Sequence, residues 1–169
     1  ELVDMNGDYI NMRLVKSDEE LDWFRIGAAL SDLSIDALER ELRPGLTEHE
    51  VADLIERAYV PWGGRTGIHF IGSTPMKNPF LQVPAQFTSS RTVQSGDILV
   101  AEISESFREY SGQVLRSFAV DSEPTPLYLK LHSVAEAAFN EILKATRPGA
   151  SASDLVQAGK VIENSGFTI

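Results

Sequence analysis

The stretch "LRPGLTEHEVADLIE", residues 42–56, has a second copy in "TRPGASASDLVQAGKVIENSGF", residues 146–167. In both, an Arg-Pro-Gly turn is followed by a hydroxyl residue and, three positions later, by an acid. This is the pattern of a helix N-terminal capping box. The turns begin at Arg43 and Arg147, 104 residues apart, and the capping and apolar positions behind them keep the same offset. We infer a duplicated helix–turn–helix unit, with the strands of a sheet between the copies.

A longer helix precedes each of these turns. Ser17 and Glu20 form another capping box, and the apolar stripe behind them predicts a helix up to about Leu42. In the second copy, Thr125 before Pro126 is typical of an N-cap followed by proline at the first helical position. Each copy is therefore expected to be a pair of helices.

The segment between the helix pairs is expected to supply the sheet. Residues 66–73, 97–104 and 113–120 are rich in strand-forming side chains, whereas residues 74–94 contain three prolines and predict mostly loop. Helices grouped at the ends of an antiparallel sheet indicate an α+β fold class.

Charge and composition narrow the choice of partners. Of the 169 residues, 15 are Lys or Arg and 25 are Asp or Glu, so the formal net charge is −10. This excess repels phosphate backbones and argues against nucleic acid as a partner. No apolar run is long enough to span a membrane, no export signal opens the chain, and cysteine is absent. We expect a cytoplasmic protein that acts on a small molecule or a peptide.

Two polar side chains interrupt the apolar pattern of the predicted hairpin "VAEISESFREYSGQVLRSF", residues 100–118. With the turn centred on Phe107 and Arg108, Glu102 lies directly opposite Gln113, on the same sheet face. A carboxylate there needs a partner, because burying it unpaired costs several kcal/mol. Two interpretations stay open: a hydrogen-bonded pair on a partly solvated face, or a functional site.

Four stretches of this sequence resemble the pita-bread family of creatinase, prolidase, aminopeptidase P and methionine aminopeptidase. They are "RLVKSDEELDWFRIGAALSD", "LRPGLTEHEVADLIE", "GDILVAEISESFREYSGQVLRSFAV" and "TRPGASASDLVQAGKVIENSGF". The resemblance implies pseudo-two-fold helix pairs around a curved antiparallel sheet, and a homodimer. It implies that residues 1–12 end a linker from a preceding domain, and that residues 13–169 are the N-terminal half of a catalytic domain in a longer protein.

The resemblance also points to a metal site. In metal-dependent members, two aspartates of this hairpin bind a pair of divalent ions (Mn, Co, Zn or Fe), and this sequence has Glu102 and Gln113 in their places. A substrate-contacting histidine of the family is replaced by Ala85-Gln86. Because an amide carbonyl cannot bridge two cations as a carboxylate does, we expect the dinuclear site to be altered or lost.

The resemblance implies a hydrolase related to Xaa-Pro aminopeptidase and creatinase, which cleaves an amide-like C–N bond in a small carboxylate-bearing or peptide substrate. We expect substrate contacts from Glu102, Gln113, Arg116 and His69, with the general base supplied by the missing half. The alternative role for Arg116 is to brace the hairpin. Alternative functions are an inactive binding or scaffold protein, a single-ion metallopeptidase, and a family lyase whose loop resembles residues 78–82.

Overall fold

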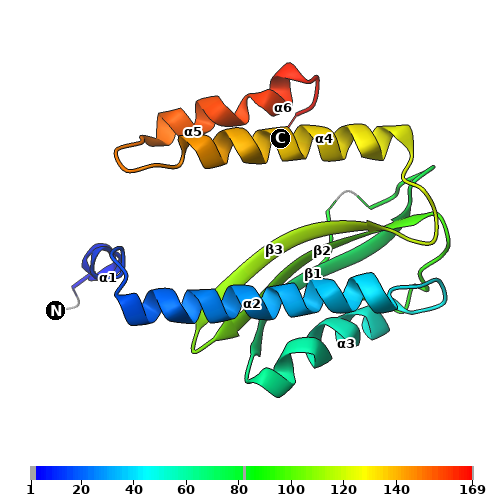
Figure 1. The fold of residues 1–169 in the computed structure, drawn as a ribbon, viewed down its shortest axis with the longest axis horizontal. Helices are drawn as coiled ribbons and strands as arrows, with labels where there is room; N and C mark the ends of the chain where they lie inside the picture. Colours follow the sequence, from blue (N-terminus) through cyan, green and yellow to red (C-terminus); the bar gives the residue numbers. More distant parts are fainter. Residues whose placement is uncertain (1–2, 82, 169) are drawn as a thin grey trace. The chain divides into compact units, whose positions relative to one another are not determined.

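The computed structural model describes residues 3–81 and 83–168 and has an α+β architecture, as predicted (Figure 1). Two compact units divide the chain at Ser122–Glu123. The elements are α1 (Asn6–Met12), α2 (Asp18–Glu41), α3 (Glu48–Tyr59), the 3-10 helix η1 (Val60–Trp62), β1 (Arg65–Pro75), β2 (Asp97–Phe107), β3 (Tyr110–Ala119), α4 (Pro126–Ala145), α5 (Ala152–Gly159) and α6 (Val161–Asn164).

The duplicated turns have the same backbone conformation in both copies. Gly45 and Gly149 adopt φ values of 97° and 85°, a left-handed conformation that glycine adopts without strain. Thr47 and Ser151 each cap the following helix with the reciprocal hydrogen bonds of a capping box. The predicted duplication of turn and cap is therefore confirmed.

In the first unit, helices α2 and α3 cover one face of an antiparallel sheet of order β1-β2-β3 (Figure 1). The core between helices and sheet consists of the buried residues Leu30, Leu38, Val51, Ile55, Tyr59, Ile71, Val93, Leu99, Ala101, Ile103 and Val120. Helix α2 approaches β3 backbone to backbone, since a Cβ added to Gly27 would lie 2.8 Å from the Gly112 nitrogen. Only glycine allows this contact.

The second unit consists of helices α4, α5 and α6. Helix α4 begins after Thr125 with Pro126 in its first turn, as predicted, but the Thr125 side chain makes no capping hydrogen bond. The second helix of the copy ends at Gly159 and is followed by the four-residue helix α6. Ala138 is the buried residue of α4.

The predicted hairpin register is wrong by two residues. The turn residues are Arg108 and Glu109, with φ of 50° and 68°, and Phe107 pairs with Tyr110. Glu102 therefore lies opposite Leu115 rather than Gln113. The sequence lacks the Asn-Gly signal of such a turn, and two ordinary residues adopt the positive φ that matches the twist of the strands. Because side chains alternate with a period of two, this shift leaves Glu102 and Gln113 on one face.

The segments outside these elements have little regular structure. Within residues 76–81 and 83–94, Ala85 and Thr92 each form an isolated β-bridge, Ala85 with Ile71 and Thr92 with Thr47. Residues 6–12 of the predicted linker form α1, which has no buried residue. Residues 1–2 of the linker lie outside the described residues. The same holds for Gln82, in the loop that resembles the family lyase. None of the described helices is long and apolar enough to cross a membrane.

Candidate functional site

The two faces of the sheet carry different chemistry. Ala101 and Ile103 of β2 are buried under α2 and α3, on what we call the helix-covered face. Glu102 points to the opposite face, which we call the Glu102 face, because side chains alternate along a strand. Leu115 is the cross-strand partner of Glu102 and therefore lies on the same face. Because β2 pairs with β3 without a bulge, Gln113, two positions before Leu115, also lies on the Glu102 face.

Glu102 and Gln113 form a diagonal hydrogen-bonded pair. The Gln113 side-chain amide nitrogen donates to Glu102 Oε1 over 2.5 Å. An ionised carboxylate can only accept, so the amide must turn its nitrogen toward Glu102 and leave its oxygen free. Glu102 is half-buried and Gln113 is exposed. The pair is satisfied internally and retains acceptor atoms for another molecule.

The neighbours of Glu102 are apolar on both sides. Phe70 of β1 and Leu115 of β3 are its direct cross-strand partners, and the Leu115 side chain is 59% exposed. One row further along, Ser104 pairs with Gln113. Ser104 is only 6% exposed, and its hydroxyl has no hydrogen-bond partner among residues 3–81 and 83–168. A buried hydroxyl without a partner is uncommon and calls for an explanation.

His69 lies on the helix-covered face, away from Glu102. Its cross-strand partner is Ile103, and its Nε2 lies 2.9 Å from the Tyr59 hydroxyl. Its Nδ1 lies 3.2 Å from the Ser104 backbone nitrogen and 3.1 Å from the Ile68 carbonyl oxygen. Burial lowers the pKa of His69, so the ring is neutral at pH 7. This placement does not favour the predicted contact of His69 with a substrate beside Glu102.

Arg116 also points away from the Glu102–Gln113 pair. It pairs with Ala101 across the strands, on the helix-covered side, and its guanidinium donates to the Leu115 carbonyl over 2.8 Å. The structure thus brings together two of the four predicted substrate-binding residues, Glu102 and Gln113, and separates the other two from them. Arg116 lies on the helix-covered side because this hairpin has no bulge. A bulge before residue 116 would have turned Arg116 to the Glu102 face.

Glu102 and Gln113 do not fit a pair of divalent metal ions as two aspartates would. They supply one negative charge, and the amide nitrogen occupies one oxygen of the only carboxylate. Within the described part of the chain, no group of three or more His, Cys, Asp or Glu side chains is placed to hold a metal. Divalent cations in such centres favour several oxygen or nitrogen ligands, with carboxylates bridging the ions.

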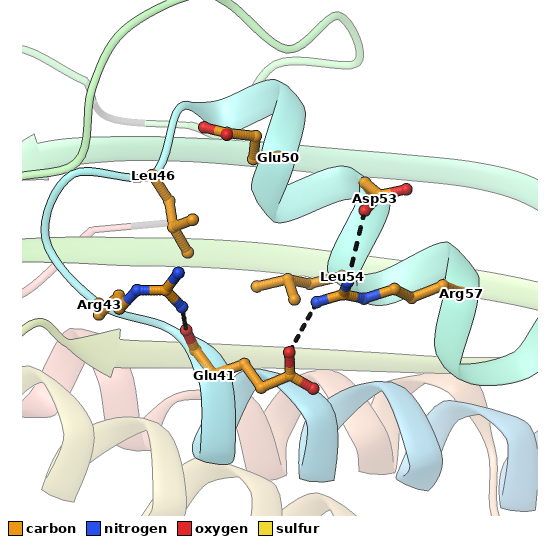
Figure 2. A pocket seen from close by; sticks show the side chains of 7 residues that line it. All are labelled: Glu41, Arg43, Leu46, Glu50, Asp53, Leu54 and Arg57. Atoms are coloured by element: carbon orange, nitrogen blue, oxygen red, sulfur yellow. Dashed lines mark hydrogen bonds and ion pairs between the residues drawn. The ribbon is translucent and has the colours of Figure 1, made fainter.

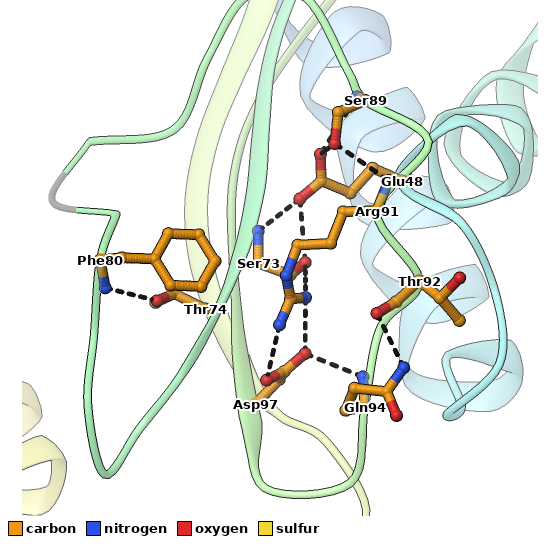
Figure 3. Close-up of polar contacts among 9 residues, drawn as sticks. All are labelled: Glu48, Ser73, Thr74, Phe80, Ser89, Arg91, Thr92, Gln94 and Asp97. Atoms are coloured by element: carbon orange, nitrogen blue, oxygen red, sulfur yellow. Dashed lines mark hydrogen bonds and ion pairs between the residues drawn. The ribbon is translucent and has the colours of Figure 1, made fainter.

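A buried polar network that sequence reasoning missed joins α3, β1 and the following loop (Figure 3). Glu48 is 6% exposed and accepts four hydrogen bonds, from the backbone N–H and the hydroxyl of Ser73 and of Ser89. Arg91 makes a two-pronged contact with Asp97, over 2.7 and 3.0 Å, and donates to Ser73. Burial alone would raise the pKa of Glu48, but these hydrogen bonds outweigh it and lower the pKa.

Glu105 is a second buried acid that the sequence did not reveal. It is fully buried, Ser31 contacts its Oε1, and its Oε2 has no partner among the residues described. Ser31 also lies 2.7 Å from the Gly112 carbonyl oxygen. A hydroxyl has one proton, so both contacts are satisfied when Glu105 is protonated and donates to Ser31. Burial raises the pKa of Glu105, which agrees with this proton count.

A hollow of about 350 Å³ lies at the turn between α2 and α3 (Figure 2). Among its charged groups, Arg57 contacts Glu41 at 2.6 Å and Asp53 at 3.9 Å. Arg43 donates to the Glu41 carbonyl oxygen. Arg57 is thus engaged by two carboxylates, and Glu50 accepts from the Thr47 cap, so most of the polar groups that line the hollow already have partners. The Glu102 face therefore remains the candidate site.

Residues 22–168 match the model of Metallopeptidase family M24. The chain belongs to this family. Creatinase of Bacillus sp. is 26% identical over 163 residues, which are 92% of this chain and 38% of creatinase. The Xaa-Pro dipeptidase of Pyrococcus furiosus is 21% identical over 159 residues, 93% of this chain and 44% of that protein. The chain thus spans less than half the length of these M24 relatives.

Solved M24 structures confirm the pita-bread fold. The dipeptidase PepE from Mycobacterium ulcerans matches with a TM-score of 0.82 and 27% identity, over 97% of this chain and 44% of PepE. X-Pro aminopeptidase from Thermotoga maritima matches with a TM-score of 0.83 and 21% identity, over 98% of this chain and 47% of that protein. The predicted identification as a first-half pita-bread segment is confirmed.

Proposed function

We propose that the full-length protein is an M24 hydrolase that cleaves an amide-like C–N bond in a small or peptide substrate, with the dinuclear metal site altered or absent. The observation that carries this proposal is the Glu102–Gln113 hydrogen bond on the Glu102 face, at the positions where the resemblance places two metal-binding aspartates. The names of the relatives, dipeptidase and creatinase among them, support the reaction class.

In this proposal the described residues bind and orient substrate. Gln113 holds the carboxylate of Glu102 in one direction, and Phe70 and Leu115 restrict the space on either side of it. If the substrate carries a carboxylate, as the resemblance implies, a cationic group other than Arg116 binds it, because Arg116 lies on the opposite face of the sheet. The general base comes from outside this chain. A cytoplasmic location and a homodimer stay predictions.

A binding or scaffold protein is the second candidate. The replacement of a metal-binding aspartate by Gln113 favours it, because an amide cannot perform the bridging role of a carboxylate. The two candidates differ in one outcome: only the hydrolase turns over a substrate.

The test uses full-length protein purified without chelator. Metal content is measured by inductively coupled plasma mass spectrometry, and hydrolysis of Xaa-Pro dipeptides and of small carboxamides and amidines is followed before and after dialysis against a chelator. We expect less than one equivalent of metal and turnover that survives dialysis. Glu102→Ala is expected to lower kcat/KM by about 100-fold or more, as for a lost charged contact to substrate.

The matched control is Glu39→Ala, which removes an exposed carboxylate of α2. It should leave kcat/KM unchanged. Absence of turnover on all substrates in the wild-type protein would favour the scaffold function. Two equivalents of metal and loss of activity on dialysis would overturn the altered metal site.

A further inference from the structure

We propose that Glu105, Ser31 and the Gly112 carbonyl form a proton-dependent latch between α2 and β3. While Glu105 is neutral, Ser31 holds β3 against the helix, and when Glu105 loses its proton this hold on Gly112 is released. The latch acts on the strand that carries Gln113, and it operates whether or not the protein is a hydrolase. It is carried by the hydrogen bonds open to Ser31, by the close contact of α2 with β3 and by the charges around Glu105.

The Ser31 hydroxyl lies between two acceptors on different strands. Its oxygen contacts Glu105 Oε1 of β2 and lies 2.7 Å from the Gly112 carbonyl oxygen of β3. A hydroxyl has one proton to donate, and a backbone carbonyl can only accept. With a neutral Glu105, the acid donates to Ser31 and Ser31 donates to Gly112, so both contacts are hydrogen bonds. With an ionised Glu105, the carboxylate is the stronger acceptor, so Gly112 loses its donor.

Water cannot replace the lost hydrogen bond unless α2 moves. Glu105 is fully buried, and its Oε2 has no partner among residues 3–81 and 83–168. At Gly112 the backbones of strand and helix are in contact, since a Cβ added there would clash with the Ala28 nitrogen. Backbones packed this closely leave no room for a water molecule between them. Hydration of an ionised Glu105 therefore requires α2 and β3 to separate.

The ionisable groups around Glu105 oppose a negative charge on it. Burial raises the pKa of Glu105, and the Asp32 carboxylate of α2 raises it further. Tyr59 of α3 is neutral, because burial raises its pKa to about 12. His69 of β1, which contacts the Tyr59 hydroxyl, is neutral as well, because burial lowers its pKa. Glu56 of α3 adds a further negative charge beside these two side chains.

The latch lies between two other fixed points of β3. Toward the hairpin turn, the Tyr110 hydroxyl donates to Glu20 of α2 over 2.6 Å. In the other direction, Gln113 directly follows Gly112 and donates to Glu102 on the opposite face of the sheet. Release of Gly112 frees the backbone next to Gln113. The proton on the helix-covered face is thereby coupled to the geometry of the Glu102 face.

The test measures both the proton and the latch in full-length protein. Difference infrared spectroscopy of wild type and Glu105→Gln detects the carbonyl stretch of a protonated carboxylic acid, which lies above the amide bands. We expect this band in wild type at pH 6 and its loss in Glu105→Gln. Hydrogen–deuterium exchange from pH 5 to 8, corrected for the intrinsic exchange rate, measures how often β3 opens. Peptides that cover residues 110–119 report on β3, and peptides from α3 are the internal reference.

The loss of one proton on opening sets the expected size of the effect. Between the pKa values of the open and the closed state, protection of residues 110–119 should fall about tenfold per pH unit. Protection in Glu105→Gln should not change with pH, because the amide stays neutral and can donate to Ser31. Ser31→Ala should lower protection about three- to tenfold at pH 5, where the latch is closed. The control Glu39→Gln, on the exposed side of α2, should behave like wild type.

Several outcomes overturn the proposal: no protonated-acid band in wild type at pH 6, constant protection of β3 from pH 5 to 8, or the wild-type pH dependence in Glu105→Gln. An equal loss of protection in α3 would assign the effect to global unfolding and overturn it as well. Should a variant fail to fold, the wild-type band is titrated instead and must disappear in step with protection. A band that disappears while protection stays constant excludes the latch. None of these measurements uses turnover, so their outcome is independent of the proposed function.

Discussion

The two faces of the sheet treat their ionisable groups in opposite ways. On the helix-covered face, Glu48, His69, Asp97 and Glu105 are buried, and each is held by hydrogen bonds or an ion pair to its neighbours. On the Glu102 face, Glu102 is half-buried and retains free acceptor atoms. The difference indicates that Glu48 and Asp97 hold the helix-covered face together, whereas Glu102 is less buried and keeps acceptor atoms free.

The largest expected effect is on the helix-covered face, at Glu48. Glu48→Ala leaves the two buried donors of Ser73 and the two donors of the exposed Ser89 without their acceptor, and should lower the free energy of unfolding by about 2–4 kcal/mol. Urea unfolding of full-length protein at pH 7 measures it. Glu39→Ala, on the exposed side of α2, is the control and should stay within about 0.5 kcal/mol. A loss below about 1 kcal/mol at Glu48 would contradict the structural role of the network.

The contact between α2 and β3 predicts the next effect. Gly27→Ala places a Cβ 2.8 Å from the backbone of Tyr110 and Gly112, so the helix must shift, at a cost of about 1–3 kcal/mol. Gly7→Ala is its matched control, because nothing lies within 4 Å of a Cβ added in α1. The same unfolding measurement compares the two. Equal stability of the two variants would mean that α2 does not press on β3.

A pH dependence should separate Glu105 from the other acids. Its pKa is raised in the folded protein, so its contribution to stability is full below the unfolded pKa and is lost as pH rises toward the folded pKa. Glu105→Gln removes this loss. As pH rises from 4 to 8, the free energy of unfolding of the variant should therefore increase relative to wild type, by about 1.4 kcal/mol for each unit of pKa elevation.

The quantity to compare is the difference in the free energy of unfolding between Glu105→Gln and wild type. The stability of either protein alone also contains the contribution of Glu48, which changes with pH in the opposite direction. The pKa of Glu48 is lowered, so its contribution is present above the unfolded pKa and is lost as pH falls through the folded pKa. Urea unfolding at several pH values, with both proteins in the same buffers, cancels this common part. A difference that stays constant with pH would show that Glu105 is ionised in the fold.

The smallest effect on stability is expected at the candidate site. Glu102→Ala removes one hydrogen bond between a half-buried and an exposed side chain, so the free energy of unfolding should change by about 1 kcal/mol or less. Thermal unfolding measures it alongside kcat/KM. A large loss of stability here would place Glu102 with the structural acids and remove the contrast between the two faces.

Much of the fold could be predicted because its signals are local. The capping residues Ser17, Thr47 and Ser151 each begin a helix as expected, and the repeated Arg-Pro-Gly turns identify the duplication. These features depend on hydrogen bonds within one turn of helix. The hairpin register was missed because Arg108 and Glu109 form the turn without the residues that usually announce positive φ.

Patterns within the sequence suffice to predict the α+β class, the two helix pairs and the family. They also place Glu102 and Gln113 on one face, since a register shift of two preserves the face. The placement of His69 and Arg116 on the opposite face and the burial of Glu48 and Glu105 become visible in the folded protein alone. The physical reason is that face and burial depend on bulges, turns and helix docking, such as the irregularity between Thr66 and Ile68 and the contact of Gly27 with Gly112. Such contacts join residues far apart in the chain.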